Sequence, residues 1–143
     1  MKPIVFASAQ DAEAAFYEAF ENCDINAMMA VWADEEEVVC IHPSGARLTG
    51  TLKVRDSWRQ IFTSGIKLNF CITDQQYVTG LQLAIHNVYE HITVVGEAKS
   101  RNPVIATNVY ILTARGWRML MHHGSQVPDK AVVPLEPTPT TLH

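Results

Sequence analysis

The amino-acid sequence predicts one α+β domain, in which three N-terminal helices pack on a curved antiparallel sheet. Apolar residues recur at helical spacing before position 63, interrupted by a short apolar strand at 38–41. From Leu68 onward apolar and polar residues alternate as in strands. Helices followed by strands indicate an α+β layout rather than alternating β-α-β units. Because a long sheet of this kind curls, we expect a cone with a cavity between sheet and helices.

Each helix is predicted from a cap and an apolar stripe. Ser8 and Asp24 are expected to cap the first two helices, and Thr51 the third, which Gly65 ends. The first stripe comprises Ala12, Ala15, Phe16, Ala19, Phe20 and Cys23, the second Ile25, Met28, Met29 and Trp32, and the third Val54, Trp58, Ile61 and Phe62. The acidic run at 34–37 is expected to be a solvated turn.

Four long strands complete the predicted sheet beside the 38–41 strand. The first begins at Leu68, and the second covers about 82–95, where slipping alternation predicts a bulge near Asn87. The last two strands, near 104–114 and 117–123, are joined by the short turn Ala114-Arg115-Gly116. Residues 1–127 are therefore expected to form the domain, and the Pro/Thr-rich segment 128–143 a tail.

Bulk composition narrows the environment and the partners. A chain of 143 residues with net charge −4 and no basic run is not expected to bind nucleic acid. No segment is apolar for long enough to span a membrane or to serve as a signal peptide. Three scattered cysteines without C-x-x-C spacing predict reduced thiols in a cytoplasmic protein.

Three segments carry a resemblance to a known family. They are Cys40-Ile41-His42-Pro43-x-Gly45, Ala106-Thr107-Asn108-Val109-Tyr110, and Gly116-Trp117 through His123-x-Ser125. The chain resembles the nuclear transport factor 2-like superfamily, in particular SnoaL-like proteins related to the association domain of calcium/calmodulin-dependent protein kinase II. The resemblance implies a cone-shaped, cystatin-like fold and a homodimer formed through the convex sheet face. It implies no single activity, because this fold hosts isomerases, cyclases, hydratases, hydrolases and association modules.

His42 and Asn108 are the first catalytic candidates. In ketosteroid isomerases, members of the same superfamily, an aspartate base precedes the proline of a similar turn, and His42 takes that place here. A histidine accepts a proton near neutral pH; alternatively, His42 only shapes the turn. Asn108 matches the position of an oxyanion donor, and its amide needs no shifted pKa to donate. Alternatively, it binds water or a neighbouring strand.

The first helix departs from the isomerase pattern. Phe16 stands where those enzymes have the oxyanion tyrosine, and Tyr17 is turned by about 100° from that position. Because base and donor must converge on one substrate, steroid isomerisation is not expected.

His123 and Glu90 are the candidates for a second proton carrier. His122 and His123 are neighbours in a strand, so only one can face inward; the resemblance favours His123 without fixing its direction. Glu90 lies on the face of Val88 and Ile92, which is either the cavity face, where burial would raise its pKa, or the convex face. The spacing of the histidines predicts no metal site, and no cofactor is indicated.

The sequence thus predicts a small-molecule-binding protein with a partly apolar pocket. The expected ligand-binding residues are Trp58, Phe16, Tyr17, His122, Tyr110 and Trp32. The protein is either an acid/base catalyst of isomerase, cyclase or hydratase type acting on a small organic substrate, or a non-catalytic association module with a vestigial pocket. Either way we expect a homodimer.

Overall fold

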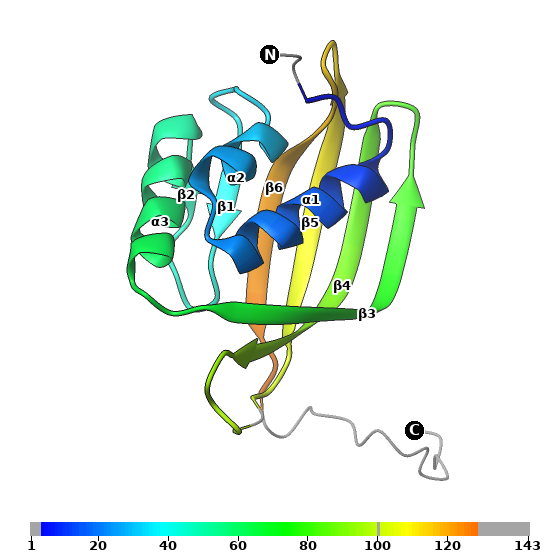
Figure 1. Cartoon of the computed structure of the whole chain (residues 1–143). Helices are drawn as coiled ribbons and strands as arrows, with labels where there is room; N and C mark the ends of the chain where they lie inside the picture. The colour runs from blue at the N-terminus through cyan, green and yellow to red at the C-terminus, as the bar shows by residue number, and fades with distance from the viewer. Residues whose placement is uncertain (1–3, 100, 129–143) are drawn as a thin grey trace, which may run out of the picture.

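The computed structural model describes residues 4–99 and 101–128, and within them it confirms the predicted α+β class (Figure 1). The elements are α1 Ala9–Asn22, α2 Ile25–Val31, β1 Val39–Ile41, β2 Leu48–Thr49, α3 Thr51–Thr63, β3 Leu68–Thr79, β4 Leu83–Val94, β5 Val104–Thr113 and β6 Gly116–Gln126. Nearly all of the predicted 128–143 tail lies outside the described residues.

The strands form one sheet in the order β2-β1-β6-β5-β4-β3. α1 crosses the concave face over the long strands, and α3 stands beside β1 and β2 (Figure 1). The sheet is not wholly antiparallel as predicted, because β1 pairs in parallel with β6. The two-residue strand β2, paired with β1, was not predicted, since so short a segment carries no readable alternation.

Two of the three predicted helix caps are confirmed. The Ser8 hydroxyl accepts from the backbone N–H of Asp11 at 3.0 Å, and the Asp24 carboxylate caps α2 in the same way. The Thr51 prediction is wrong, because Gly50 with a φ of 88° is the N-cap of α3. The Thr51 hydroxyl instead donates to the carbonyl of Glu35, which ties the acidic turn to α3.

A bulge bends the sheet opposite Asn87, but it lies in β3 and not, as predicted, in β4. The pairing between β3 and β4 shifts between Thr73 and Gln76, so the extra residue lies in β3. Figure 1 shows β3 bending part-way along, so that its first half passes below α1. β4 itself is regular, and its alternation seemed to slip only because the polar residues His86 and Glu90 face inward.

Aromatic side chains fill much of the space between α1, α3 and β3. The Phe20 ring lies 4.7 Å from Trp58 and 4.4 Å from Phe70, and the Phe16 ring lies 5.6 Å from Trp58 (centroid distances). Phe16 and Trp58 are fully buried. The interior of the cone is therefore packed with rings that hold α1 and α3 against the curled end of the sheet.

Candidate functional site

A connected set of polar side chains lies between α1 and the concave face of the sheet, and we call it the buried polar network. Its members are Glu13, Tyr17, Tyr77, His86, Glu90, Asn108, Tyr110 and His122. All except Tyr77 are buried. Buried polar groups of this kind are costly unless they satisfy one another, so the contacts among them decide what the network can do.

Glu13 is the central acceptor of the network. Its Oε2 accepts from His86 Nδ1 at 3.0 Å, from the Tyr110 hydroxyl at 3.0 Å and from Asn108 Nδ2 at 3.3 Å. Its Oε1 accepts from the Tyr77 hydroxyl at 2.9 Å. Burial alone would raise the pKa of Glu13, but the hydrogen bonds and the charge of His86 outweigh it and hold the pKa below its ordinary value.

Asn108 joins the two halves of the network. Its Nδ2 donates to Tyr17 at 3.0 Å as well as to Glu13, so both amide protons are used inside the protein. We expected this amide to serve as an oxyanion donor for a ligand, whereas it holds neighbouring side chains in place. Its Oδ1 lies 2.6 Å from His122 Nδ1, which fixes the proton of that imidazole on Nδ1.

His122, rather than His123, is the histidine that faces inward. His122 is 2% exposed and His123 is exposed on the opposite face of β6, so the expectation that His123 belongs to the site is wrong in its placement. Burial, followed by the charges of His42 and His123, lowers the pKa of His122 to about 3. His122 is therefore a neutral imidazole at physiological pH.

Tyr17 and Glu90 form the other end of the network. The Tyr17 hydroxyl donates to Glu90 Oε2 at 2.6 Å and accepts from Asn108, although we expected Tyr17 to be turned by about 100° from the position of the isomerases' oxyanion tyrosine. The curl of the sheet brings both β4 and β5 under this turn of the helix. The expectation from the helix rotation alone did not take the position of these strands into account. Glu90 lies on the concave face, and burial, only partly opposed by the hydrogen bond from Tyr17, raises its pKa to about 7.

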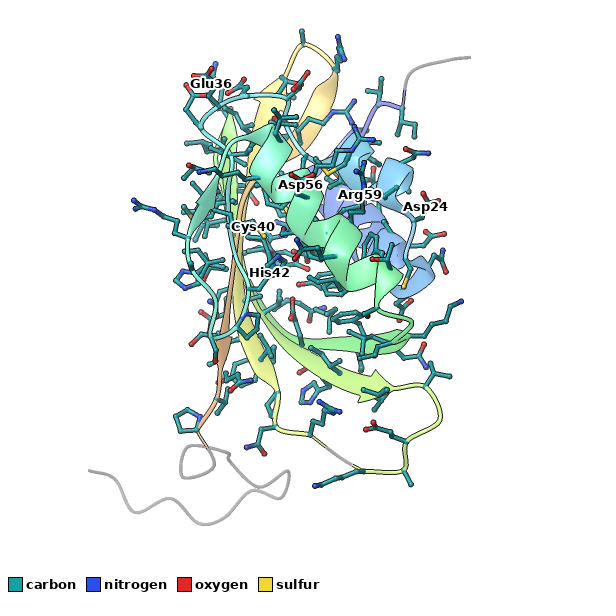
Figure 2. All side chains as sticks on the ribbon, turned by 90° about the vertical axis from the view of Figure 1, so that its left-hand side faces the viewer. Asp24, Glu36, Cys40, His42, Asp56 and Arg59 are labelled. Carbon is teal, nitrogen blue, oxygen red and sulfur yellow. The ribbon has the colours of Figure 1, made fainter. Side chains whose placement is uncertain are left out.

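A separate opening, which we call the His42 cavity, lies between α3, the turn after β1 and the ends of β3 and β4. Its volume is about 720 Å³, and its walls include His42, Ser57, Gln60 and Ile61. Figure 2 looks onto α3 and shows His42 between this helix and the sheet. No member of the buried polar network borders this cavity.

His42 is held in one orientation at the wall of this cavity. Its Nε2 lies 3.1 Å from Ser57 Oγ, and the Ser57 hydroxyl donates to the carbonyl of Val54 at 2.7 Å. With the Ser57 proton on that carbonyl, His42 Nε2 donates to Ser57 and Nδ1 is left as an acceptor; Nε2 also lies 3.5 Å from the Cys40 thiol. Burial lowers the pKa of His42, so the imidazole is neutral at physiological pH.

Aromatic packing connects His42 with the buried polar network. The His42 ring stands edge-on to Trp58 at 4.8 Å and lies 6.5 Å from the His122 ring (centroid distances).

The nearby thiol of Cys40 is not a nucleophile at physiological pH, since burial raises its pKa to about 12.

The expected ligand-binding residues do not line the His42 cavity. Five of these side chains are buried in the interior and do not border this cavity: Trp58, Phe16, Tyr17, His122 and Tyr110. Trp32 borders a different cavity, of about 870 Å³, at the end of α2. The physical reason is that interlocking rings fill the cone, so the open space lies to one side of them.

Sequence reasoning missed Glu13, His86 and Ser57. Glu13 stands one helical turn before Tyr17 and directly beside the apolar stripe of α1. This position could have indicated that its carboxylate faces the sheet. The alternation of Ala84, His86, Val88 and Glu90 along β4 was another indication. Ser57 carried no signal, because its contact with His42 joins α3 to the turn after β1.

The part of the chain that the structure describes contains neither a cluster of metal ligands nor a helix that could span a membrane. Residues 4–99 and 101–128 contain no group of three His, Cys, Asp or Glu side chains placed to hold a metal ion. Within the same ranges no helix is long and apolar enough to cross a membrane.

Comparison with known proteins gives one family and several relatives. A model of the SnoaL-like domain matches residues 10–130. A Thiobacillus denitrificans structure whose name proposes a calcium/calmodulin-dependent protein kinase type II association domain is 38% identical, with a TM-score of 0.79, over 87% of this chain and 99% of that one. A Streptomyces avermitilis structure whose name proposes a dehydratase of the NTF2-like family is 31% identical, with a TM-score of 0.75, over 82% and 91% of the two chains.

More distant relatives add little about activity. F-box protein SKIP8 of Arabidopsis thaliana is 26% identical over 120 residues, which are 82% of this chain and 50% of that protein. The chain thus spans about half the length of this curated relative. An NTF2-like protein from Pseudomonas putida, 18% identical with a TM-score of 0.76 over 90% of this chain and 93% of that one, shares the fold.

Proposed function

Because this chain belongs to the SnoaL-like domain family, we propose that it binds a small, partly apolar organic molecule in the His42 cavity and transfers protons on it. His42 is the proposed base. The reaction class is acid/base chemistry next to a carbonyl group, of isomerase, cyclase or hydratase type. The NTF2-like relative named for a dehydratase, at 31% identity, supports chemistry of this class.

The observation that carries the proposal is the state of His42. The imidazole is neutral, its Nε2–H is committed to Ser57, and its Nδ1 is left to accept a proton at the wall of a cavity. A cavity of about 720 Å³ lies in the range typical of small-molecule sites. Removal of a proton beside a carbonyl leaves negative charge on the carbonyl oxygen, and the side-chain amide of Gln60 in the same wall is the proposed donor to it.

The buried polar network is proposed to support this site from behind. Asn108 holds His122 in one tautomer, and His122 packs with Trp58 against the His42 ring. Glu90 is 2% exposed and fixes Tyr17, so we assign it a positioning role. A rigid ring behind the base keeps it in one geometry, which general base catalysis requires.

A test uses a ketide-like probe, the N-acetylcysteamine thioester of acetoacetate, in deuterated buffer. The protein is expected to accelerate loss of the α-proton signal in the NMR spectrum, and His42→Ala is expected to return the rate to background. The matched control is His91→Gln, a histidine on the outer face of β4 that bonds Thr73. Equal rates for His42→Ala and the parent protein would contradict His42 as the base.

A second proposal, an association module, is favoured by the 38% identical relative named for an association domain. Assembly through the outer sheet face is part of both proposals, as a homodimer. Val78 and Ile85 are cross-strand neighbours there, 66% and 43% exposed. Native mass spectrometry separates the proposals: an assembly that retains an organic mass supports the ligand site, and an assembly that is empty supports the module. Val78→Lys with Ile85→Lys is expected to give monomers.

A further inference from the structure

A second cavity lies away from the His42 cavity and shares none of its lining residues. Its volume is about 870 Å³, and it is bordered by the end of α2, the first turns of α3, the turn between β5 and β6, and Ile4. We call it the arginine cavity, because Arg55, Arg115 and Arg118 all border it. In a chain of net charge −4, three guanidinium groups around one cavity are unusual and call for a physical account.

The three arginines are not equivalent. Arg118 is nearly buried, and its guanidinium donates to the backbone carbonyls of Ala30, Ile4 and Arg115, so it holds the walls together. Arg55 and Arg115 are exposed. Neither of their guanidinium groups has a hydrogen bond or an ion pair with any residue in the described ranges. Two free cations therefore face a cavity whose third cation is already fixed.

The carboxylates at this cavity form no ion pair with those cations in the described structure. Asp34 and Glu35 also border it, but neither lies within ion-pair distance of an arginine in the described structure. The Thr51 hydroxyl lies 3.4 Å from Asp34 Oδ1 and 3.2 Å from the Glu35 carbonyl, which ties this turn to α3. The acidic turn is thus held at the start of α3, the helix that also carries Arg55, and no guanidinium donor of Arg55 or Arg115 is used on it.

The rest of the wall is apolar. Met29 and Ala33 line it beside Trp32, which is 3% exposed. The indole Nε1–H of Trp32 is buried and has no acceptor among the described residues. Because this N–H is shielded from the open part of the cavity, Trp32 borders the cavity through its other atoms and adds to the apolar wall.

We propose that the arginine cavity binds a small organic anion, a monocarboxylate with an apolar body. Arg55 and Arg115 recognise the carboxylate, and Met29, Ala33 and Trp32 cover the body. Arginine is suited to this role, since its fork of N–H donors matches a carboxylate. The site is independent of the His42 cavity, so a ligand here would be a second, regulatory or co-binding molecule.

The test is a titration of the full-length protein with hexanoate, followed through the indole N–H resonance of Trp32, assigned with Trp32→Phe. Hexanoate is expected to move this resonance saturably. Arg55→Gln and Arg115→Gln are each expected to weaken binding about tenfold or more. Arg59→Gln is the matched control. Arg59 lies one turn further along α3 (Figure 2) and does not border the cavity.

Several results would overturn the proposal. These are an unmoved Trp32 resonance, Arg59→Gln weakening hexanoate as much as Arg55→Gln does, or sulfate binding as tightly as hexanoate. Tighter binding of 6-aminohexanoate would replace the anion with a zwitterion held also by Asp34 and Glu35. Saturable binding of hexanoate that survives His42→Ala and is lost in Arg115→Gln would establish the site whatever becomes of the His42 cavity.

Discussion

The buried polar network and the His42 cavity divide between them what an active site needs. The network has several ionisable groups, including a carboxyl group whose pKa is raised to about 7 by burial, but it borders neither described cavity. The His42 cavity has open space and one histidine whose pKa burial lowers. Shifted pKa values often mark functional sites. In this protein the shifted pKa values belong first of all to the residues that hold α1 against the sheet.

The difference between the two regions follows from access to water. Groups beneath α1 can be charged only if the protein itself supplies hydrogen bonds, as four donors do for Glu13. At the cavity a ligand or water can supply them. Changes in the network should therefore alter stability most, and changes at the cavity should alter binding most.

The largest effect is expected for Glu13→Ala. The substitution removes the acceptor of His86, Asn108 and Tyr110 and leaves these donors buried and unpaired. We expect the free energy of unfolding to fall by about 3–5 kcal/mol, measured by urea denaturation. Glu18→Ala, an exposed position on the same helix, is the control and should change it by less than about 0.5 kcal/mol. Similar losses for both variants would show that the network does not hold α1.

The pH dependence of Glu90 is the next largest effect. Its folded pKa of about 7 lies above the ordinary 4.5, so the carboxyl costs nothing below pH 4.5 and destabilises the fold as pH rises towards 7. His122, whose pKa is lowered to about 3, acts oppositely, since stability is lost as pH falls from 6.5.

Glu90→Gln isolates the two contributions. From pH 4.5 to 7 the free energy of unfolding of Glu90→Gln should rise by about 3 kcal/mol relative to that of the parent protein. The measurement is urea denaturation of both proteins across this range. A difference that does not vary with pH would mean that Glu90 titrates normally.

Tyr17→Phe should have an intermediate effect. It removes the 2.6 Å hydrogen bond to Glu90 and one acceptor of Asn108, at a cost of about 1–3 kcal/mol. It should also raise the pKa of Glu90 further, since that hydrogen bond favours the carboxylate. Tyr89→Phe on the outer face of β4 is the matched control. An unchanged carboxyl titration in the NMR spectrum of Tyr17→Phe would contradict the assignment.

The smallest effect on stability is expected for His42→Ala. Its ring is half-buried and bonds Ser57, so the loss should be about 1 kcal/mol in thermal or urea unfolding. Binding in the His42 cavity should nevertheless be lost. A loss of stability as large as that of Glu13→Ala would place His42 among the structural residues and break the comparison.

The sequence predicted the fold well because the fold depends on local periodicity. The stripe of α1, its Ser8 cap and the alternation from Leu68 are each visible within a few residues. The bulge was misplaced because inward-facing polar residues such as His86 disturb alternation as much as an extra residue does.

The site was predicted less well because it depends on contacts between distant segments. His42 was identified from its place before Pro43 and from the resemblance to the isomerase turn; the structure places it at a cavity wall, and its catalytic role stays a prediction. Tyr17 and His123 were misplaced, since facing depends on how the sheet curls. The role of Glu13 depends on its partners in β4 and β5, which lie far from α1 in the sequence.

The parallel pairing of β1 with β6 has a consequence for how the chain reaches its fold. More than half of the chain lies between Val39 and its partner Met121, so this contact closes a very long loop. On the ribosome β1 emerges early and must wait for the last strand to be synthesised. Until then His42 has no neighbouring His122. The helices can thus form early, whereas the packing of the His42 ring near His122 forms only after the last strand has been synthesised.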